Sequence, residues 1–168
     1  REPESAVPET FTAFSLPARA LTMADWQEAL AGKTAGQEAV AVRLKTSAGT
    51  VYFDAASAVS GAVETAVDTA AALADLTARE GLYTIASLAC LQDFKAASAD
   101  VESRGLKNTG GYIFYDGNNS LWLDPAKPAT REYVCALARE IAELGFDELL
   151  LTDFSYPTVG KINKIHYN

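Results

Sequence analysis

The chain has 168 residues, a net charge of −8 at neutral pH and a pI near 4.6. This acidic balance argues against nucleic acids and anionic membranes as partners. No stretch approaches the ~20 consecutive apolar residues of a membrane span. The composition, 49% hydrophobic and 21% charged, is typical of a globular domain with a real core. Neutral or cationic small molecules, sugars and other proteins remain as candidate partners.

The two cysteines, Cys90 and Cys135, are too few for a disulfide framework, and both are expected to be buried thiols. Because His166 is the single histidine, we expect no metal site, and we expect no cofactor. Residues 1–10 are polar and lack an initiator methionine, which predicts a flexible tail after a cleaved leader or a trimmed end. A cleaved leader would imply bacterial-type export to an extracytoplasmic or cell-surface location.

The first part of the chain predicts two strands around a helix. Residues 11–16 form the first strand, and Thr22 is a plausible N-cap for the helix that follows. Residues 38–44 form the second strand. The pattern after it predicts a hairpin with Ala48-Gly49 at its turn.

The middle of the chain repeats this order. Residues 67–79 predict a helix, and the apolar run 82–90 predicts a buried strand of the parallel type. A short helix or turn opens at Gln92. Residues 104–120 are rich in Gly and Asn and predict a long irregular excursion, a kind of segment that is usually functional.

Residues 121–157 predict a second helix-to-strand unit. Asp124 and the prolines after it indicate a helix start, with Asp124 as its cap, and Gly145 indicates the helix end. The helix carries an apolar stripe, and Leu149–Leu151 then predict a buried strand that ends near residue 152. The stripe consists of Tyr133, Leu137, Ile141 and Leu144.

Strands near 11–16, 38–44, 82–90 and 147–152 thus alternate with helices. Alternation of this kind predicts an α/β fold with a parallel sheet and right-handed crossovers.

Three stretches resemble the family of putative glycosyl hydrolase domains, long described as a domain of unknown function. The most specific is Trp122–Leu151, WLDPAKPATREYVCALAREIAELGFDELLL, which matches a W-x-D-P motif, a helix and a GFDEI segment. ASLACLQDFKAA resembles the family's third-strand segment, where Asp93 matches the acid. VAVRLKTSAGTVYF resembles the second strand, where Lys45 and Gly49 match.

The resemblance implies a (β/α)8 TIM-barrel-like fold related to glycoside hydrolases, with a sugar-facing site at the carboxyl ends of its strands. It covers residues 11–157, which we take as the domain, followed by a polar tail at 158–168 without a clear element. A full barrel needs ~250 residues, so this chain supplies about four of its βα units. We therefore expect a fragment that pairs with the missing half of the barrel, or a homo-oligomer that covers the open sheet edges.

One family motif departs from the template. Where the family has F-D-Y-x-R-F-P, the acid falls on Thr152 and the arginine on Ser155. Asp153 stands one position later, and it could replace the acid if a bulge turned its side chain.

The resemblance and the strand ends together give the candidate residues. Asp153 and Asp93 are the catalytic candidates, but Asp93 could instead cap a helix or pair with Lys45 or Lys95. The candidates for substrate binding are Lys45, Trp122, Tyr156 and Tyr115. Lys45 could bind a sugar hydroxyl or neutralise Asp93, and the aromatic residues could stack on sugar rings or belong to the core.

Three functions therefore remain open. The first is a carbohydrate-active glycoside-hydrolase-like domain, catalytically impaired because the aligned acid and arginine are replaced. The second is a non-catalytic carbohydrate- or cell-wall-binding module, and the third is a protein-interaction domain on the same scaffold.

Overall fold

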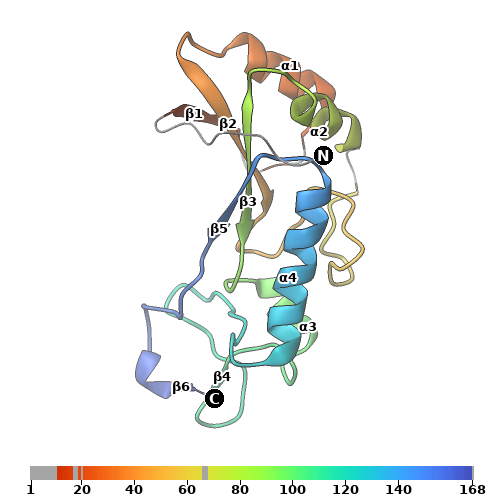
Figure 1. Cartoon of the computed structure of the whole chain (residues 1–168). Helices are drawn as coiled ribbons and strands as arrows, with labels where there is room; N and C mark the ends of the chain where they lie inside the picture. Colours follow the sequence, from red (N-terminus) through yellow and green to blue (C-terminus); the bar gives the residue numbers. More distant parts are fainter. Residues whose placement is uncertain (1–10, 17–18, 20, 66–67, 168) are drawn as a thin grey trace.

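The computed structural model describes residues 11–16, 19, 21–65 and 68–167. Its centre is a four-stranded parallel sheet in the order β1-β2-β3-β5 (Figure 1). The strands are β1 (Thr12–Ser15), β2 (Gln37–Lys45), β3 (Tyr83–Ala89) and β5 (Glu148–Thr152). All four strands predicted from the sequence are confirmed, as is the parallel α/β class. The predicted tail at residues 1–10 lies outside the described residues.

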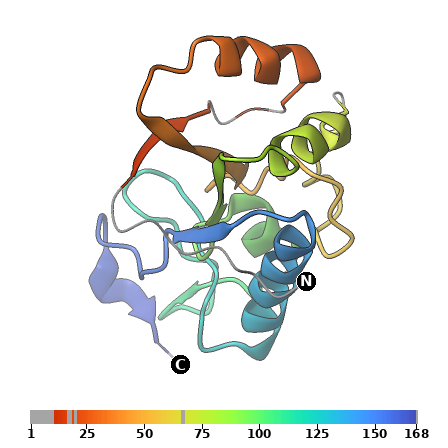
Figure 2. The ribbon, with the colours of Figure 1, turned by 45° about the horizontal axis from the view of Figure 1, so that its top comes forward.

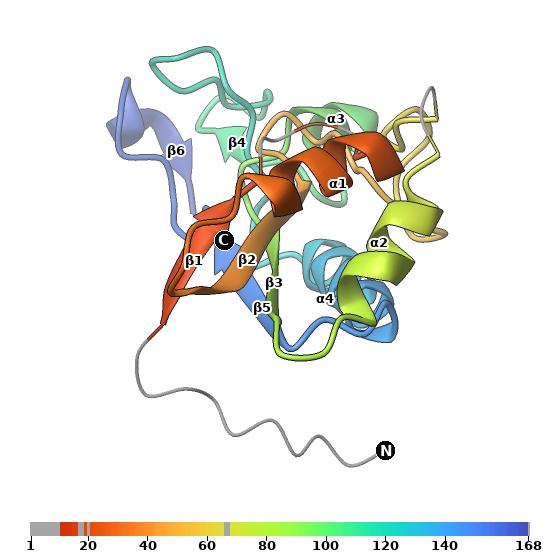
Figure 3. The ribbon, with the colours of Figure 1, turned by 90° about the horizontal axis from the view of Figure 1, so that it is seen from above.

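The helices of the alternating units pack on one face of the sheet (Figures 1 and 3). They are α1 (Met23–Ala31), α2 (Ala70–Thr77), α3 (Phe94–Ala99) and α4 (Pro128–Glu143). Thr22 caps α1 as predicted, because its side chain accepts a hydrogen bond from the Asp25 N–H while the Asp25 side chain accepts one from Thr22. The apolar face of β2 and the inner stripe of α4 form the core between sheet and helices.

The excursion after α3 lies beyond the carboxyl ends of β3 and β5, and the C-terminal segment packs beside it (Figures 1 and 2). Strand β4 (Lys107–Asn108) pairs antiparallel with β6 (Ile165–His166), which follows the short 3-10 helix η1 (Ile162–Lys164). The prediction of a tail without a clear element is therefore wrong for residues 162–166. Ile165 is buried, and its burial supplies the apolar contact that holds this segment in place.

Two glycines allow the C-terminal segment to approach the excursion. Gly160 has φ +90, and a Cβ built on it would lie 2.5 Å from the Gly117 backbone nitrogen. Gly117 in turn donates a hydrogen bond to the Val159 carbonyl at 3.2 Å. A side chain at Gly160 would thus meet both an unfavourable backbone conformation and a neighbouring backbone.

Three predictions about burial and capping are wrong. Leu150 and Leu151 are 45% and 47% exposed, because β5 is the last strand of the sheet and no described element covers its outer side. Cys135 is exposed because it lies on the outer side of α4. Lys127, not Asp124, is the N-cap of α4; the Asp124 carboxylate instead accepts the Ala126 N–H within the preceding turn. The helix predicted at residues 67–79 is also shorter, since α2 spans Ala70–Thr77.

In the part of the chain that the structure describes, no helix is both long and apolar enough to cross a membrane.

Candidate functional site

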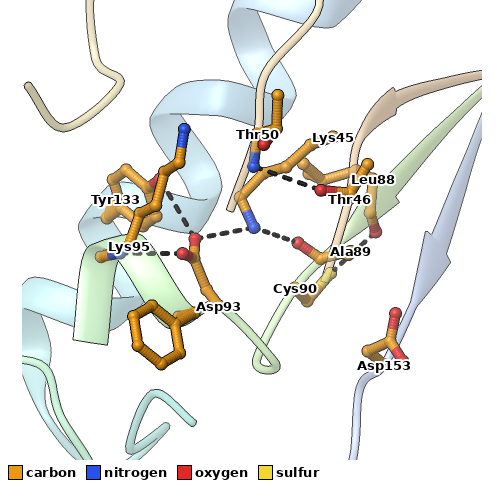
Figure 4. Close-up of polar contacts among 12 residues, drawn as sticks. Lys45, Thr46, Thr50, Leu88, Ala89, Cys90, Asp93, Lys95, Tyr133 and Asp153 are labelled. Atoms are coloured by element: carbon orange, nitrogen blue, oxygen red, sulfur yellow. Dashed lines mark hydrogen bonds and ion pairs between the residues drawn. The ribbon is translucent and has the colours of Figure 1, made fainter. Parts of the chain in front are cut away.

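The carboxyl ends of the strands, where such folds hold their chemistry, contain a buried ion pair. The ammonium of Lys45, at the end of β2, lies 2.8 Å from the Asp93 carboxylate. It also donates a hydrogen bond of 2.7 Å to the Ala89 carbonyl at the end of β3. The pairing of β2 with β3 is irregular between Arg43 and Lys45. Lys45 therefore binds the ends of two strands and the start of α3 together (Figure 4).

Besides Lys45, three parts of the fold contact Asp93. Its carboxylate accepts the Ala96 N–H at 2.8 Å, so it caps α3, and the Tyr133 hydroxyl of α4 lies 3.3 Å away. The predicted hairpin turn also packs here, since a Cβ on Gly49 would clash with an oxygen of the Asp93 carboxylate. The interpretations of Asp93 as a cap and as a partner of Lys45 are both confirmed.

The Lys45–Asp93 pair is closed to solvent. Its side chains are 1% and 0% exposed. Burial, and next the charge of Asp93, raises the pKa of the Tyr133 hydroxyl, which keeps that hydroxyl protonated as a donor. In this conformation a sugar cannot reach either charge, so the arrangement is that of a structural ion pair. A role for either residue with substrate stays a prediction and would require the cluster to open.

Asp153 lies at the end of β5, away from the Lys45–Asp93 pair (Figure 4). It is half-buried and has φ +52, a left-handed conformation that Asp tolerates better than most residues. Its carboxylate accepts a hydrogen bond of 3.0 Å from the Thr152 hydroxyl. The pairing of β3 with β5 is regular up to Thr152, so no bulge precedes Asp153. Conformations of this kind gather at functional sites, which keeps Asp153 a catalytic candidate.

Cys90 lies close to this strand end. Its N–H donates to the Thr152 carbonyl at 2.9 Å, and its side chain is fully buried, as predicted. Burial raises the pKa of the Cys90 thiol to about 11, with the charge of Asp153 acting in the same direction and Lys45 opposing it. Cys90 is consequently a neutral core thiol and not a nucleophile.

The aromatic candidates divide between core and surface. Trp122 is buried, and its indole N–H donates to the Asp116 carboxylate at 2.9 Å. Tyr156 is half-buried and packs edge-on against Tyr167, with ring centroids 5.0 Å apart. Tyr115 is 52% exposed and lines a surface pocket. Of the predicted aromatic contacts, Tyr115 is therefore the one best placed to meet a ligand.

Asp116 anchors the excursion and was not singled out from the sequence. Its carboxylate accepts the N–H groups of Asn118 and Ser120, each at 2.8 Å, in addition to the Trp122 indole. The segment Asp-Gly-Asn-Asn is a turn pattern that could have indicated this role. Asp116 thus positions the excursion, and with it Tyr115.

Two open pockets lie between the excursion and the C-terminal segment, each with a volume of about 420 Å³. Four lysines line them, at positions 107, 127, 161 and 164. The sequence did not indicate these residues, because Lys107 and Lys127 are distant along the chain from Lys161 and Lys164. The two pairs approach each other only in the folded chain, where β4 pairs with β6 and the Thr109 N–H donates to the Lys164 carbonyl. In the residues that the structure describes, no group of three or more His, Cys, Asp or Glu side chains could hold a metal ion.

Comparison with solved structures supports the α/β fold. A hypothetical protein from Ruminiclostridium thermocellum matches with a TM-score of 0.73 and 22% identity, over 94% of this chain and 81% of that one. The cycloalternan-degrading enzyme from Trueperella pyogenes matches with a TM-score of 0.54 and 15% identity, over 84% of this chain and 24% of that one. The cycloalternan-forming enzyme from Listeria monocytogenes, solved with a pentasaccharide substrate, gives a TM-score of 0.55 and 10% identity, over 84% and 16% of the two chains.

The sequence itself gives the family. Residues 22–168 match the model of the family described as "Putative glycosyl hydrolase domain", and the chain belongs to that family. The resemblance seen in its motifs is therefore confirmed. A comparison with curated proteins finds no match. The chain spans less than a quarter of the two cycloalternan enzymes but most of the thermocellum protein.

Proposed function

We propose that this glycosyl-hydrolase-like domain binds carbohydrate, and that its described residues do not form a complete hydrolytic site by themselves. The family assignment and the fold shared with two cycloalternan enzymes support a role with carbohydrate. The positions of the acidic residues at the strand ends support the proposal that the hydrolytic site is incomplete.

The observation that carries this proposal is the burial of one of the two catalytic candidates. Glycoside hydrolysis requires two carboxyl groups facing one sugar, about 5–5.5 Å or 6.5–9.5 Å apart. Asp93 is fully buried against Lys45, whereas Asp153 is half-buried at the end of β5. Asp153 is therefore the one candidate of the pair with access to solvent. Hydrolysis would need a second carboxylate from a closed barrel or from another chain.

Replacement of the family's acid and arginine points in the same direction. The family acid falls on Thr152. Leu149 packs against the core and side chains alternate along a strand, so Thr152, like Leu150, faces the side of the sheet opposite the helices. In a closed barrel that side would be the interior. A hydroxyl there can bind a sugar but cannot act as an acid at neutral pH.

We further propose that the sheet is half of a (β/α)8 barrel, completed by another chain or by further units. Edge strands β1 and β5 leave their outer backbone groups without a strand partner in the described part of the chain. Leu150 and Leu151 expose apolar surface at the same edge. Exposed apolar edges of this kind favour pairing.

This edge also supports the second candidate, a protein-interaction domain. Under that alternative, the exposed leucines of β5 bind a partner and the domain has no glycan ligand. Under the proposed function, the same edge closes the barrel around a sugar site.

A glycan array with the full chain separates the two functions. Binding of glycans supports the proposed function, whereas self-association without binding of any glycan supports the interaction domain. Aryl-glycoside hydrolysis assays on the same protein should show no turnover. If turnover is observed, the incomplete-site proposal is wrong, and Asp153→Asn then tests whether Asp153 is its acid.

A further inference from the structure

Two adjoining pockets beyond the carboxyl ends of the sheet form a lysine-lined surface, which we call the tail cleft. The first pocket is lined by Lys107, Lys127, His166 and Glu102, among others. The second is lined by Lys161, Lys164, Tyr112 and Tyr115, among others. Both pockets include Asn108 and Thr109, so they adjoin at this turn.

The fold positions the tail cleft firmly. Thr109 donates its N–H to the Lys164 carbonyl at 2.8 Å, and β4 pairs with β6. Gly117 and Gly160 pack backbone against backbone nearby. Backbone contacts, and not the lysine side chains, therefore hold the C-terminal segment against the excursion.

The charge of the tail cleft is opposite to that of the chain. Its four lysines and Glu102 give +4 − 1 = +3, whereas the whole chain carries −8. The remaining residues therefore carry −8 − 3 = −11. Cations gathered on one surface of an acidic domain favour an anionic ligand by charge complementarity.

The lysines differ in how they are held. The Lys127 ammonium donates to the carbonyls of Val101 at 3.0 Å and Gly105 at 2.7 Å, which fixes it at the first pocket. Burial lowers the pKa of Lys127, and the neighbouring charge of Lys107 adds to this effect. Lys107 is paired with Glu102. Lys161 and Lys164 are exposed, and neither forms a salt bridge with another described residue.

The aromatic residues of the tail cleft offer flat apolar surfaces. Tyr112 is 76% exposed and Tyr115 is 52% exposed. Exposed tyrosines of this kind are typical of binding surfaces, since the ring contacts an apolar face while the hydroxyl stays hydrated. The apolar face of a pyranose ring is such a partner.

We propose that the tail cleft binds a chain of acidic sugars, with uronic acid carboxylates at the lysines and the sugar rings on Tyr112 and Tyr115. The proposal rests on the proposed function for taking a carbohydrate, and it adds the site and the charge of the ligand. Two adjoining pockets, each of about 420 Å³, suit several linked rings better than a single small anion. The strong negative charge elsewhere on the chain disfavours the dense phosphates of a nucleic acid.

The test is calorimetric titration of the full chain with uronic acid hexasaccharides. The panel contains hexagalacturonate, hexamannuronate and a hyaluronan hexasaccharide, together with methyl-esterified hexagalacturonate and neutral maltohexaose. We expect at least one acidic hexasaccharide to bind, with affinity falling about tenfold or more in high salt. If hexagalacturonate is the ligand, its methyl ester should bind about tenfold more weakly, because the ester keeps the ring but removes the charge.

Variants locate the site. Lys161→Glu/Lys164→Glu should weaken binding about tenfold or more. The control Lys33→Glu/Arg139→Glu changes the net charge equally, lines neither pocket and should leave affinity within about twofold. Tyr112→Ala should weaken binding of the same ligand without changing the thermal unfolding midpoint, because its ring is exposed.

The outcomes distinguish this inference from the proposed function. Binding of maltohexaose with no preference for acidic chains overturns the tail-cleft proposal and leaves carbohydrate binding intact. Equal loss of binding in both double variants also overturns it, since the net charge of the chain, and not the position of the lysines, would then explain the loss. Tighter binding of a single-stranded oligonucleotide than of any hexasaccharide overturns it as well. Absence of binding to every glycan on the array overturns both proposals.

Discussion

The Lys45 ammonium lies 2.8 Å from the Asp93 carboxylate, and both side chains are buried. The pair connects the end of β2 with the first turn of α3, and Tyr133 extends the connection to α4. A buried ion pair of this kind need not add much net stability, but removing one partner leaves an uncompensated charge. The Lys45–Asp93 pair therefore closes the carboxyl ends of β2 and β3, and a ligand cannot reach its charges in this conformation.

Asp93→Asn should destabilise the fold by about 3–5 kcal/mol, because it leaves the Lys45 charge buried without a partner. Urea unfolding measures the change. The control Asp54→Asn removes an exposed carboxylate and should change the free energy of unfolding by less than about 0.5 kcal/mol. Equal effects of the two substitutions would show that the Lys45–Asp93 contact does not form in solution.

The two cysteines should react very differently. Cys135 is exposed, whereas Cys90 is buried with its pKa raised to about 11. Dithionitrobenzoate should therefore label one thiol in the folded chain and two after denaturation. Cys135→Ser should abolish labelling of the folded chain. Rapid labelling of that variant under native conditions would contradict the buried position of Cys90.

Gly160→Ala should release the C-terminal segment from the excursion. The added Cβ would lie 2.5 Å from the Gly117 nitrogen, and φ +90 is unfavourable for alanine. Hydrogen exchange should show loss of protection at the Thr109 N–H, which binds the Lys164 carbonyl. The control Gly36→Ala also has positive φ, but its Cβ would meet nothing within 4 Å, so its cost should be about 1–2 kcal/mol. Retained protection at Thr109 in Gly160→Ala would refute this account of the contact.

Tyr133 should make the fold sensitive to alkaline pH. Burial raises its pKa in the folded state above the value in the unfolded chain, near 10. The protonated Tyr133 hydroxyl thus makes its full contribution to the free energy of unfolding below pH ~10. This contribution is lost as the pH rises from there towards the pKa of Tyr133 in the folded state. Urea unfolding at a series of alkaline pH values should show a weaker decline for Tyr133→Phe than for the parent chain. Tyr112→Phe, with an exposed ring, serves as the control and should decline as the parent does.

If the open edge is paired in solution, light scattering should give about twice the chain mass of 17.9 kDa. Leu150→Lys should then reduce the mass to that of one chain, because a charge on the β5 edge opposes pairing. Ile162→Lys, also exposed but on η1, should leave the dimer intact. A single-chain mass for the parent protein would exclude edge pairing between copies.

Local sequence patterns predict much of this fold, because the spacing of apolar residues indicates which face of each helix or strand is buried. The strand at residues 82–90, the Thr22 cap and the helix over the apolar stripe at Tyr133 and Leu137 follow from periodicity and capping chemistry. Family motifs also indicate the class, and they single out Lys45 and Asp93, although they do not show the contact between these two residues.

Other properties required the tertiary structure. Leu149–Leu151 have the composition of a central strand, yet Leu150 and Leu151 are exposed because the sheet ends at β5. The same limit applies to the tail cleft, where Lys107 and Lys164 come together through the β4–β6 pairing. The sequence by itself determined the parallel α/β scaffold and its family, since these depend on local patterns and motifs. Only the tertiary structure decided which acids are closed off and which lysines share a surface, because both depend on contacts between distant segments.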